Sequence, residues 1–465
     1  MKRIMTLLLA AGLVLGAGMG SAKAVELTAN GTWQFGWSWM QGLGGDSADT
    51  SDTFKAKSRL RTQFNFIASE ELQGVLQLEI GNADWGGENG WATGTDGVNL
   101  KVRYAYVDWM VPNTDLHVRM GLQPMSAPMY TFNGTVLCDA EMAALTASYQ
   151  FNEMVGVTLA WMRPYNDDSE SHDAIDLFLL SLPVTGDGWA VTPYGIVGSV
   201  ARHAMEGVGT NIDGEWGKVW GAELGYLQAG LLPVGAIALP GDKAHGVAWW
   251  AGIGGELTMF DPFRVALDFV YGSVDLGDNN RVDLKRSGWA VSGEASYALD
   301  FVTPKVGLWY ASGDDANPYD GSERMPFIYP SNAINNFGFD GGWYDADQIS
   351  VGSVGMWGAS LQFNDIQLID GLYHDLRGTY VQGTNNRAMA AVAGAPIRNY
   401  EGMYLTTGDS AWEIDFDTKY DIYKNLALHV ELSYINLDLD EAAWGHVDSD
   451  AEEAYKAGIY LTYKF

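Results

Sequence analysis

Apolar and polar residues alternate most clearly from Thr53 to Ser69, in the segment TFKAKSRLRTQFNFIAS. A period of two is the pattern of a β-strand, because successive side chains point to opposite faces of a sheet. One face is mostly apolar, and the other carries a row of four cations: Lys55, Lys57, Arg59 and Arg61. A soluble sheet would turn the charged face to bulk water. A membrane barrel would turn it to a water-filled lumen and place the apolar face on lipid.

The same alternation continues along the chain and predicts 18 strands. In the segment 98–110 it places Leu100, Val102, Tyr104 and Tyr106 on one face, opposite Lys101 and Arg103. The segment Lys218–Ala238 fits either a loop helix or another hairpin, so 16 strands is the second choice. The predicted strands are 27–39, 53–69, 71–83, 98–110, 115–123, 143–151, 153–163, 172–182, 189–201, 246–260, 263–275, 286–299, 302–312, 352–364, 372–384, 410–421, 425–437 and 453–465.

The connections between these strands alternate in length. Short turns such as Asp261-Pro262 and Asp300-Phe301 alternate with long loops, the longest near 202–245 and 313–351. Outer-membrane barrels have short periplasmic turns and long extracellular loops. The pattern therefore predicts an all-β fold, a transmembrane antiparallel up-and-down β-barrel, rather than a soluble sandwich.

The first 24 residues have the three parts of a secretory signal peptide. Lys2 and Arg3 precede an apolar stretch from Thr6 to Met19, and Ala22-Lys23-Ala24 is a cleavage site. The apolar stretch is too short for a transmembrane anchor. We expect residues 1–24 to be removed and residues 25–465 to form one barrel domain, located in the outer membrane of a Gram-negative bacterium.

Composition narrows the choice of partners. The chain has 58 acidic residues against 27 basic ones, and its net charge of −31 argues against nucleic acid as a partner. The single cysteine, Cys138, excludes an intrachain disulfide framework. Acidic residues gather in the long loops 313–351 and 438–452, where divalent cations would bridge the protein to lipopolysaccharide. These loops lack the spacing of a calcium-binding loop, so solvated loops are the simpler interpretation and no cofactor is expected.

The last strand has an alternating pattern that ends on an aromatic residue, with Ile459, Leu461, Tyr463 and Phe465 on one face. In this the chain resembles Gram-negative outer-membrane porins, whose last strand is read by the barrel-assembly machinery. The start, ELTANGTWQFGWSWM, is similar to the homotrimeric porins of sulfate-reducing bacteria. The resemblance implies a homotrimeric diffusion channel for small hydrophilic solutes and ions, with its first strands at the subunit contact and sulfate as a solute.

Strand pairing predicts how the charges meet. From the turn at Glu70, residues whose numbers sum to 140 face each other, which places Arg61 beside Glu79 and leaves Arg59, Lys57 and Lys55 without an acid on this neighbour. Lys101, Arg103 and Arg119 share the inward direction, so seven cations form one basic wall. We expect this wall to set the preference among permeant ions; simple solvation of a lumen is the alternative. If the pairing of this strand slipped by one residue, its four cations would face lipid, at a free-energy cost of about 10 kcal/mol.

Acidic candidates lie on other segments. By resemblance to general porins, the loop Pro124–Ala140 folds inward to narrow the pore, with Asp139 and Glu141 near its end. The remaining inward acids, at strands 410–421 and 425–437, are Glu413, Asp415, Asp417 and Glu431.

Catalysis is not expected. The seven histidines form no cluster with metal-ligand spacing, and no G-x-S-x-G or H-E-x-x-H motif occurs. Cys138 reads as a small packed residue. The favoured function is a passive porin with some preference for anions. The alternatives are a substrate-specific channel, which needs aromatic residues on the lumen side, and a secreted β-rich surface protein or adhesin.

Overall fold

A computed structural model describes residues 25–41, 52–87, 93, 100–132, 136–166, 174–205, 225–235, 241–279, 282–330, 353–398, 402–445 and 453–465. The predicted signal peptide and parts of the acidic loops lie outside these residues. The strands and short helices, in chain order, are β1 (Glu26–Gln41), β2 (Asp52–Ser69), β3 (Leu72–Asp84), β4 (Leu100–Met110), β5 (Leu116–Ser126), β6 (Asp139–Gln150), β7 (Gly156–Tyr165), β8 (Ile175–Ser181), β9 (Val184–Gly186), β10 (Trp189–Ala201), η1 (Arg202–Met205), β11 (His245–Phe260), β12 (Phe263–Asn279), β13 (Val282–Tyr297), β14 (Thr303–Ala311), β15 (Met356–Ile369), β16 (Leu372–Gly383), η2 (Arg387–Met389), α3 (Ala390–Ala393), β17 (Ile397–Arg398), β18 (Gly402–Met403), β19 (Ser410–Tyr423), β20 (Leu426–Asp438), α4 (Glu441–Trp444) and β21 (Glu453–Lys464).

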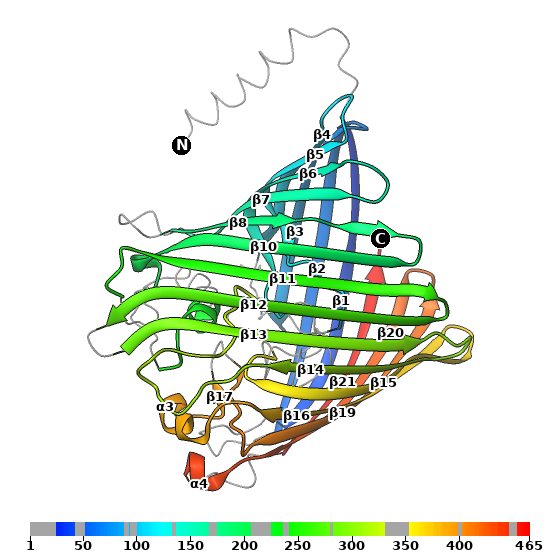
Figure 1. The fold of residues 1–465 in the computed structure, drawn as a ribbon. Coiled ribbons are helices and arrows are strands. Elements are labelled where there is room, and N and C mark those ends of the chain that lie inside the picture. The colour runs from blue at the N-terminus through cyan, green and yellow to red at the C-terminus, as the bar shows by residue number, and fades with distance from the viewer. Residues whose placement is uncertain are drawn as a thin grey trace.

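Each strand pairs antiparallel with the next one around the wall, and β1 pairs with β21, so the sheet closes into a barrel (Figure 1). β8 and β9 both pair with β10 and together occupy one position in the wall. β17 and β18 form a separate small sheet. The closed barrel therefore has 18 strands, as the alternation predicted. Among the described residues, no helix is long and apolar enough to cross a membrane.

The first and last strands join near the chain ends. The backbone N–H of Gly31 donates to the carbonyl of Phe465, and the N–H of Phe465 donates to the carbonyl of Gly31. A side chain at Gly31 would lie 2.3 Å from the carbonyl oxygen of Arg61 and 2.7 Å from the ring of Phe465, so the backbone of the neighbouring strand requires glycine where the terminal ring packs. Ile459 and Tyr463 are 38 % and 40 % exposed, on the outward face that the last-strand pattern predicted.

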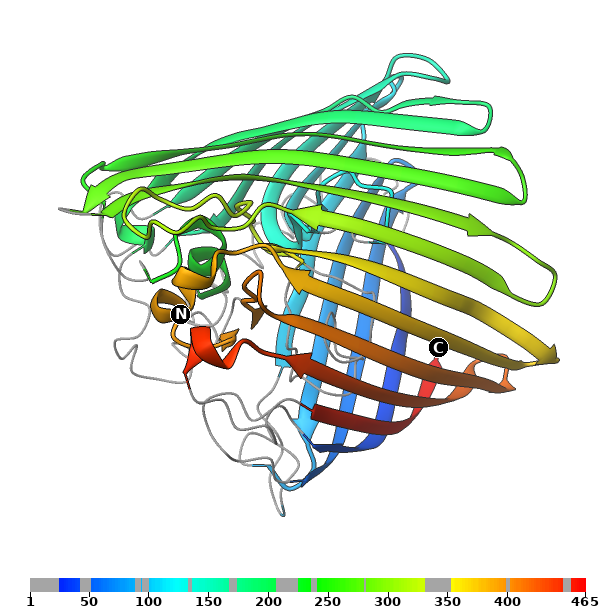
Figure 2. The ribbon, with the colours of Figure 1, turned by 60° about the horizontal axis from the view of Figure 1, so that its bottom comes forward.

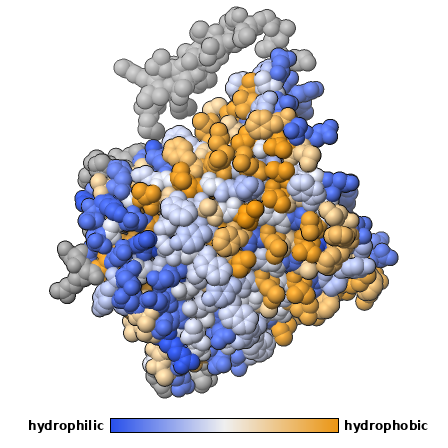
Figure 3. Space-filling view, viewed as in Figure 1, coloured by the Kyte–Doolittle hydropathy of each residue, from blue (hydrophilic) through white to orange (hydrophobic). Residues whose placement is uncertain are grey.

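The long connections lie at the opposite end of the barrel from the turns that join β11 to β12 and β13 to β14 (Figure 2). The described part of the segment Lys218–Ala238 contains a helix over 225–231, so a loop helix was the correct alternative there. The outward face of β7–β14 is largely apolar, and hydrophilic residues gather at its long-loop end (Figure 3). Barrels that meet lipid require an apolar outer band of this kind.

Candidate pore site

The cationic row of β2 faces the inside of the barrel. Arg61 pairs in register with Glu79 on β3, and its Nε lies 2.6 Å from the Glu79 carboxylate. Gln63 pairs in register with Gln77, whose side-chain amide donates to the Gln63 amide oxygen at 3.2 Å, as the turn at Glu70 predicted. On the other neighbouring strand, Arg59 donates two hydrogen bonds to Gln34 at 2.9 and 3.2 Å. These contacts hold the guanidinium groups along the wall.

One pairing in this wall was predicted wrongly. Lys57 does meet an acid on β3, because it pairs with Asp84 and its Nζ lies 3.9 Å from that carboxylate. The register shifts between Ser58 and Arg59, opposite Gly81, which has a φ of 119°. A residue at Gly81 with a side chain would clash with the Ser58 carbonyl at 2.4 Å. This β-bulge adds one residue to β3, and the alternating count stops applying beyond it.

A second bulge corrects the predicted faces of β4. The register shifts between the pairs Gln77–Tyr104 and Leu78–Val102, so Arg103 is the extra residue. Arg103 donates to Gln77 at 2.9 Å and lies over the ring of Tyr104 at 5.2 Å. Tyr104 therefore shares the inward face with Gln77, and Tyr106 follows two residues later. The prediction that these two tyrosines face outward was wrong, because a single extra residue reverses the face of every residue after it.

Arg119 on β5 lies beside the inward Tyr106, with its guanidinium carbon 4.7 Å from the ring centre. It also donates to Asp108 at 3.1 Å. His117 contacts the same carboxylate. Lys101 pairs in register with Glu79, which places it on the inward face as predicted. The seven predicted basic residues therefore lie on one continuous wall, from β2 to β5.

The loop between β5 and β6 crosses the barrel interior. The backbone N–H groups of Tyr130 and Thr131 donate to the carboxylate of Asp268 on β12, at distances of 2.6 to 3.0 Å. The N–H of Phe132 donates to Glu294 on β13 at 2.9 Å, and Arg264 donates to the carbonyl of Tyr130 at 2.7 Å. The loop is thus attached to strands that lie far around the wall from β5 and β6, which it joins.

The crossing begins where β5 leaves β4. Their pairing ends at Ala105 and Leu122, next to Gly121, which has a φ of 128° and would clash with the Ala105 carbonyl at 2.3 Å if it carried a side chain. Beyond this point β5 remains paired with β6 alone. Glu141 on β6 contacts Arg103, which also lies 3.8 Å from Glu79. The backbone N–H of Asp139 donates to the carbonyl of Tyr329, 2.7 Å away.

The predicted acids of β19 and β20 form a second charged sector. Glu413 and Asp415 are 1 % and 0 % exposed, and Arg377 on β16 lies 3.9 Å from Asp415 and contacts Asp417. On β20, Glu431 accepts a hydrogen bond from Tyr460 at 2.8 Å and lies 3.9 Å from Lys456, both on β21. Two strands, β21 and β1, lie between β20 and β2, so the acidic sector lies near the basic wall but does not touch it.

The interior differs between the two sides of the barrel. Along β7–β13 the inward residues are mostly apolar, and they pack against apolar residues of three loops in one cluster, which includes Leu177, Ile196, Trp250, Val270, Val274, Leu137, Leu231 and Phe327. Trp250 donates to the Pro326 carbonyl at 2.8 Å, and Arg286 donates to the carbonyls of Ala229, Leu232 and Met325 at 2.6 to 3.1 Å. This apolar packing occupies the interior beside β7–β13. A second apolar cluster, which includes Met356, Val381, Ile435 and Leu437, occupies the long-loop end beside β15–β21. Charged groups therefore line the interior beside β2–β5 and, on β16, β19 and β20, the part of the wall nearer the short turns.

The anchors of the crossing loop were missed in the sequence. Asp268 and Glu294 are 3 % and 5 % exposed, and Arg264 lies 2.6 Å from Glu294 and 2.7 Å from Glu256. A charged residue at an inward position, between apolar inward neighbours such as Ala266 and Val270, was the available signal. It indicates a buried partner but not which one.

Cys138 lies inside the barrel, in the root of the crossing loop. It is 2 % exposed, and burial raises the pKa of its thiol to about 12. The prediction of a small packed residue is confirmed.

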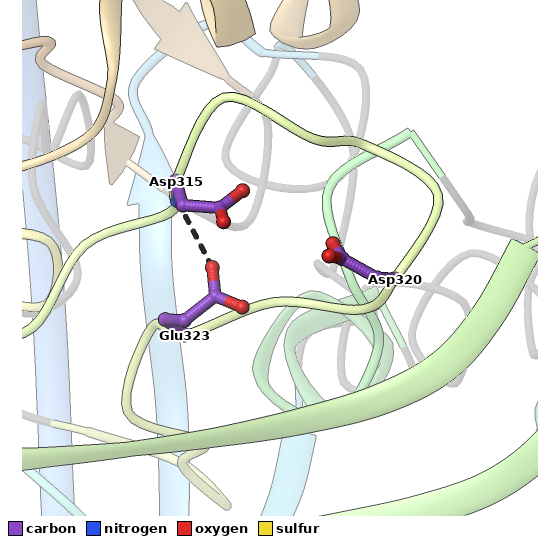
Figure 4. A group of neighbouring side chains, drawn as sticks. All are labelled: Asp315, Asp320 and Glu323. Carbon is purple, nitrogen blue, oxygen red and sulfur yellow. Dashed lines mark hydrogen bonds between the residues drawn. The ribbon is translucent and has the colours of Figure 1, made fainter.

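Three carboxylates meet in the loop between β14 and β15. The oxygens of Asp315, Asp320 and Glu323 lie within 4.8 Å of one another, and Glu323 accepts a hydrogen bond from the N–H of Asp315 at 2.9 Å (Figure 4). Burial raises the pKa of Glu323, and the nearby Asp315 and Asp314 add to the effect. Binding of divalent cations by the acidic loops stays a prediction.

The chain matches no family model and no curated protein. Solved structures match it over nearly its whole length: Acinetobacter baumannii OccAB1 with a TM-score of 0.53 and 11 % identity, covering 96 % of this chain and 99 % of that one. Pseudomonas aeruginosa OccK11 (OpdR) matches with a TM-score of 0.51 and 10 % identity, covering 96 % of this chain and 98 % of that one. Pseudomonas aeruginosa OccK8 (OprE) matches with a TM-score of 0.51 and 8 % identity, covering 95 % of this chain and 98 % of that one. The fold is that of an outer-membrane barrel. The resemblance to porins of sulfate-reducing bacteria stays a prediction.

Proposed function

We propose that this protein is an outer-membrane channel for passive diffusion of small hydrophilic solutes and ions, with a preference for anions. One observation carries the proposal: the row Lys55, Lys57, Arg59 and Arg61 faces the barrel interior, while alternate residues such as Phe54 and Phe66 are 56 % and 42 % exposed outside. Cations facing lipid at mid-membrane would cost about 2–4 kcal/mol each, so this arrangement favours a water-filled interior beside β2.

The path for solutes follows from the division of the interior. Apolar packing occupies the side of β7–β13, and the crossing loop attached to Asp268 and Glu294 spans the barrel between that side and the basic wall. A second apolar cluster occupies the long-loop end beside β15–β21, where Glu413 and Asp415 are also buried. Solutes would therefore pass along the basic wall of β2–β5. A wall of paired guanidinium and carboxylate groups orients polar solutes and disfavours apolar ones.

Anion preference rests on the basic wall, and sulfate follows only from the family resemblance. Arg59 donates to the amide oxygen of Gln34, and Arg61 and Arg103 share the carboxylate of Glu79. The acids of the outer loops oppose this preference at the entrance. We propose no catalytic activity.

A substrate-specific channel is the second candidate, and one observation favours it. The bulge in β4 turns Tyr104 and Tyr106 inward, where Arg103 and Arg119 lie over their rings. Tyr460 adds an inward aromatic side chain beside Glu431. Inward aromatic rings beside guanidinium groups would offer planar anionic solutes both a ring face and a positive charge. A secreted adhesin is disfavoured by the closed barrel and its apolar outer band.

The remaining assignments belong to the same proposal. The chain is exported with its first 24 residues removed, is read by the barrel-assembly machinery through the segment ending at Phe465, and forms homotrimers through its first strands. Exposed Trp39 and Phe54, 4.9 Å apart on the outward face of β1 and β2, support that contact.

Recordings from purified protein in a planar lipid bilayer test the proposal. We expect stepwise ion conductance, with trimers opening and closing in three equal steps. In a salt gradient, we expect the sign of the zero-current potential to show that anions permeate more easily than cations. Saturation by one added solute class, which blocks the ion current, would instead favour the substrate-specific channel. Folded protein that conducts no ions would overturn the channel proposal.

A further inference from the structure

The outward face of the barrel changes character abruptly at one rung of the sheet. Backbone pairing links Asp176 to Ser199, Ser199 to Val247, Val247 to Asp275 and Asp275 to Lys285, across β8, β10, β11, β12 and β13. The outward residues nearer the short turns on these strands are mostly apolar and exposed, including Phe178, Val197, Trp249, Trp289 and Val291. The edge of the apolar band therefore runs along this rung.

Charged side chains cluster at the rung and just beyond it. Arg163 on β7 forms a two-point contact with Asp176 at 2.8 and 2.9 Å, and the indole N–H of Trp161 donates to the same carboxylate at 2.7 Å. Lys243 lies 2.5 Å from Asp275. Ser199 and His245 are hydrogen bonded at 3.1 Å. We name this surface the outer strip; it consists of Arg163, Asp176, Ser199, Lys243, His245, Asp275 and Lys285.

The outer strip is confined to one side of the barrel. Among the described strand residues, Arg163 and Lys285 are the cations on the outward face. On β1 and β2 the outward residues at a similar distance from the short turns are Trp39 and Phe54, which are 52 % and 56 % exposed. The strip is therefore not a uniform feature of the barrel rim.

We propose that the outer strip binds the phosphorylated head groups of the outer-leaflet lipid, lipopolysaccharide. This inference rests on the proposed outer-membrane location. Charged groups at the edge of an apolar band lie at head-group depth, because they would be costly within hydrocarbon. The side chains of Arg163 and Lys243 are 39 % and 44 % exposed, and Lys285 is exposed, so all three are accessible to phosphate oxygens. Basic residues at this depth attract anionic lipid.

The carboxylates of the strip fit the same partner. Asp242, Asp278 and Asp283 flank Asp275, and acids outnumber cations in this region. Divalent cations coordinate carboxylate and phosphate oxygens together, so magnesium from solution would offset the repulsion between these acids and the lipid phosphates while the three cations contact phosphates directly. Binding is therefore expected to require both the basic residues and divalent cations.

The experiment compares folded wild-type protein with Arg163→Gln/Lys285→Gln, and uses Lys424→Gln as the control. Lys424 is an exposed cation in the turn between β19 and β20, at the opposite end of the barrel. The probe is purified lipopolysaccharide with a short sugar chain, titrated with magnesium present, and binding is read by native mass spectrometry. We expect the double variant to bind about tenfold more weakly, and the control to bind as wild type. Chelation of magnesium should weaken binding to wild type.

Each alternative outcome has a defined meaning. Equal binding of lipopolysaccharide by wild type and the double variant would overturn the inference. So would binding of wild type to phosphatidylethanolamine vesicles as strong as its binding to lipopolysaccharide. Lys285→Gln alone serves if the double variant does not fold, judged by heat-dependent gel migration. Ion conductance of all variants is measured in parallel: loss of lipid binding with normal conductance leaves the channel proposal intact, and absence of conductance in wild type counts against the channel alone.

Discussion

The carboxylate of Asp268 accepts a hydrogen bond from the backbone N–H of Thr131 over 2.6 Å, although 137 residues separate them. This contact joins the loop of one hairpin to the wall across the barrel. Glu294 and Arg264 hold the next residues of the loop in the same way. The position of this loop inside the barrel is therefore set by contacts between distant parts of the chain.

Asp268→Asn should loosen the crossing loop. A hydrogen bond to a charged group contributes about 1.5–3 kcal/mol, and the amide accepts more weakly than the carboxylate. We expect larger and noisier single-channel currents and an unchanged β-strand content by circular dichroism. Asp300→Asn, in the turn between β13 and β14, is the matched control and should leave the current as in wild type. Currents identical to wild type in Asp268→Asn would show that the loop is held without this carboxylate.

Arg59→Glu combined with Arg61→Glu should shift the zero-current potential in a salt gradient toward cation preference. The change replaces two positive charges with two negative ones on the wall that solutes pass. Lys424→Glu, outside the wall, is the control for the same kind of charge reversal at another place. An unchanged potential would remove the basic wall from the selectivity mechanism.

Glu79→Gln should shift the same potential in the opposite direction. Glu79 is 5 % exposed and lies 2.6 Å from Arg61 and 3.8 Å from Arg103, so it neutralises part of both charges. Its removal leaves two guanidinium groups with less compensation and favours anions. The measurement is the potential at two salt concentrations, because screening weakens the effect as ionic strength rises. A shift toward cations would contradict this prediction.

Labels on adjacent residues of β2 should report opposite environments. Phe64→Cys should place a spin label in lipid, and Gln63→Cys should place one in water, measured by accessibility to oxygen and to a polar relaxing agent. The native thiol should not interfere, since Cys138 is buried and its pKa of about 12 keeps it protonated at neutral pH. Matching accessibilities at the two positions would contradict the inward direction of the basic wall.

Much of the barrel was predictable from local patterns. Alternation predicted the 18 strands, and the turn at Glu70 predicted the pairing of Arg61 with Glu79, since a tight turn sets the register of the strands it joins. The prediction failed at Lys57, Tyr104 and Tyr106, because bulges at Gly81 and Arg103 each add a residue that alternation cannot count.

The sequence by itself determined where most strands lie and that the cationic row and the apolar residues of β2 occupy opposite faces, because both depend on a period of two within single strands. The barrel, and with it the inward direction of the row, was predicted from the whole chain, with 16 strands left as the second choice. Only the tertiary structure decided which interior side is filled and which stays polar. Leu177, Trp250 and Phe327 meet across distant strands and loops, and no local pattern encodes that contact. The same holds for Asp268, whose partner lies on a loop far away in the chain. An inward residue is exposed to water or buried according to what lies opposite it, and closure of the barrel fixes that.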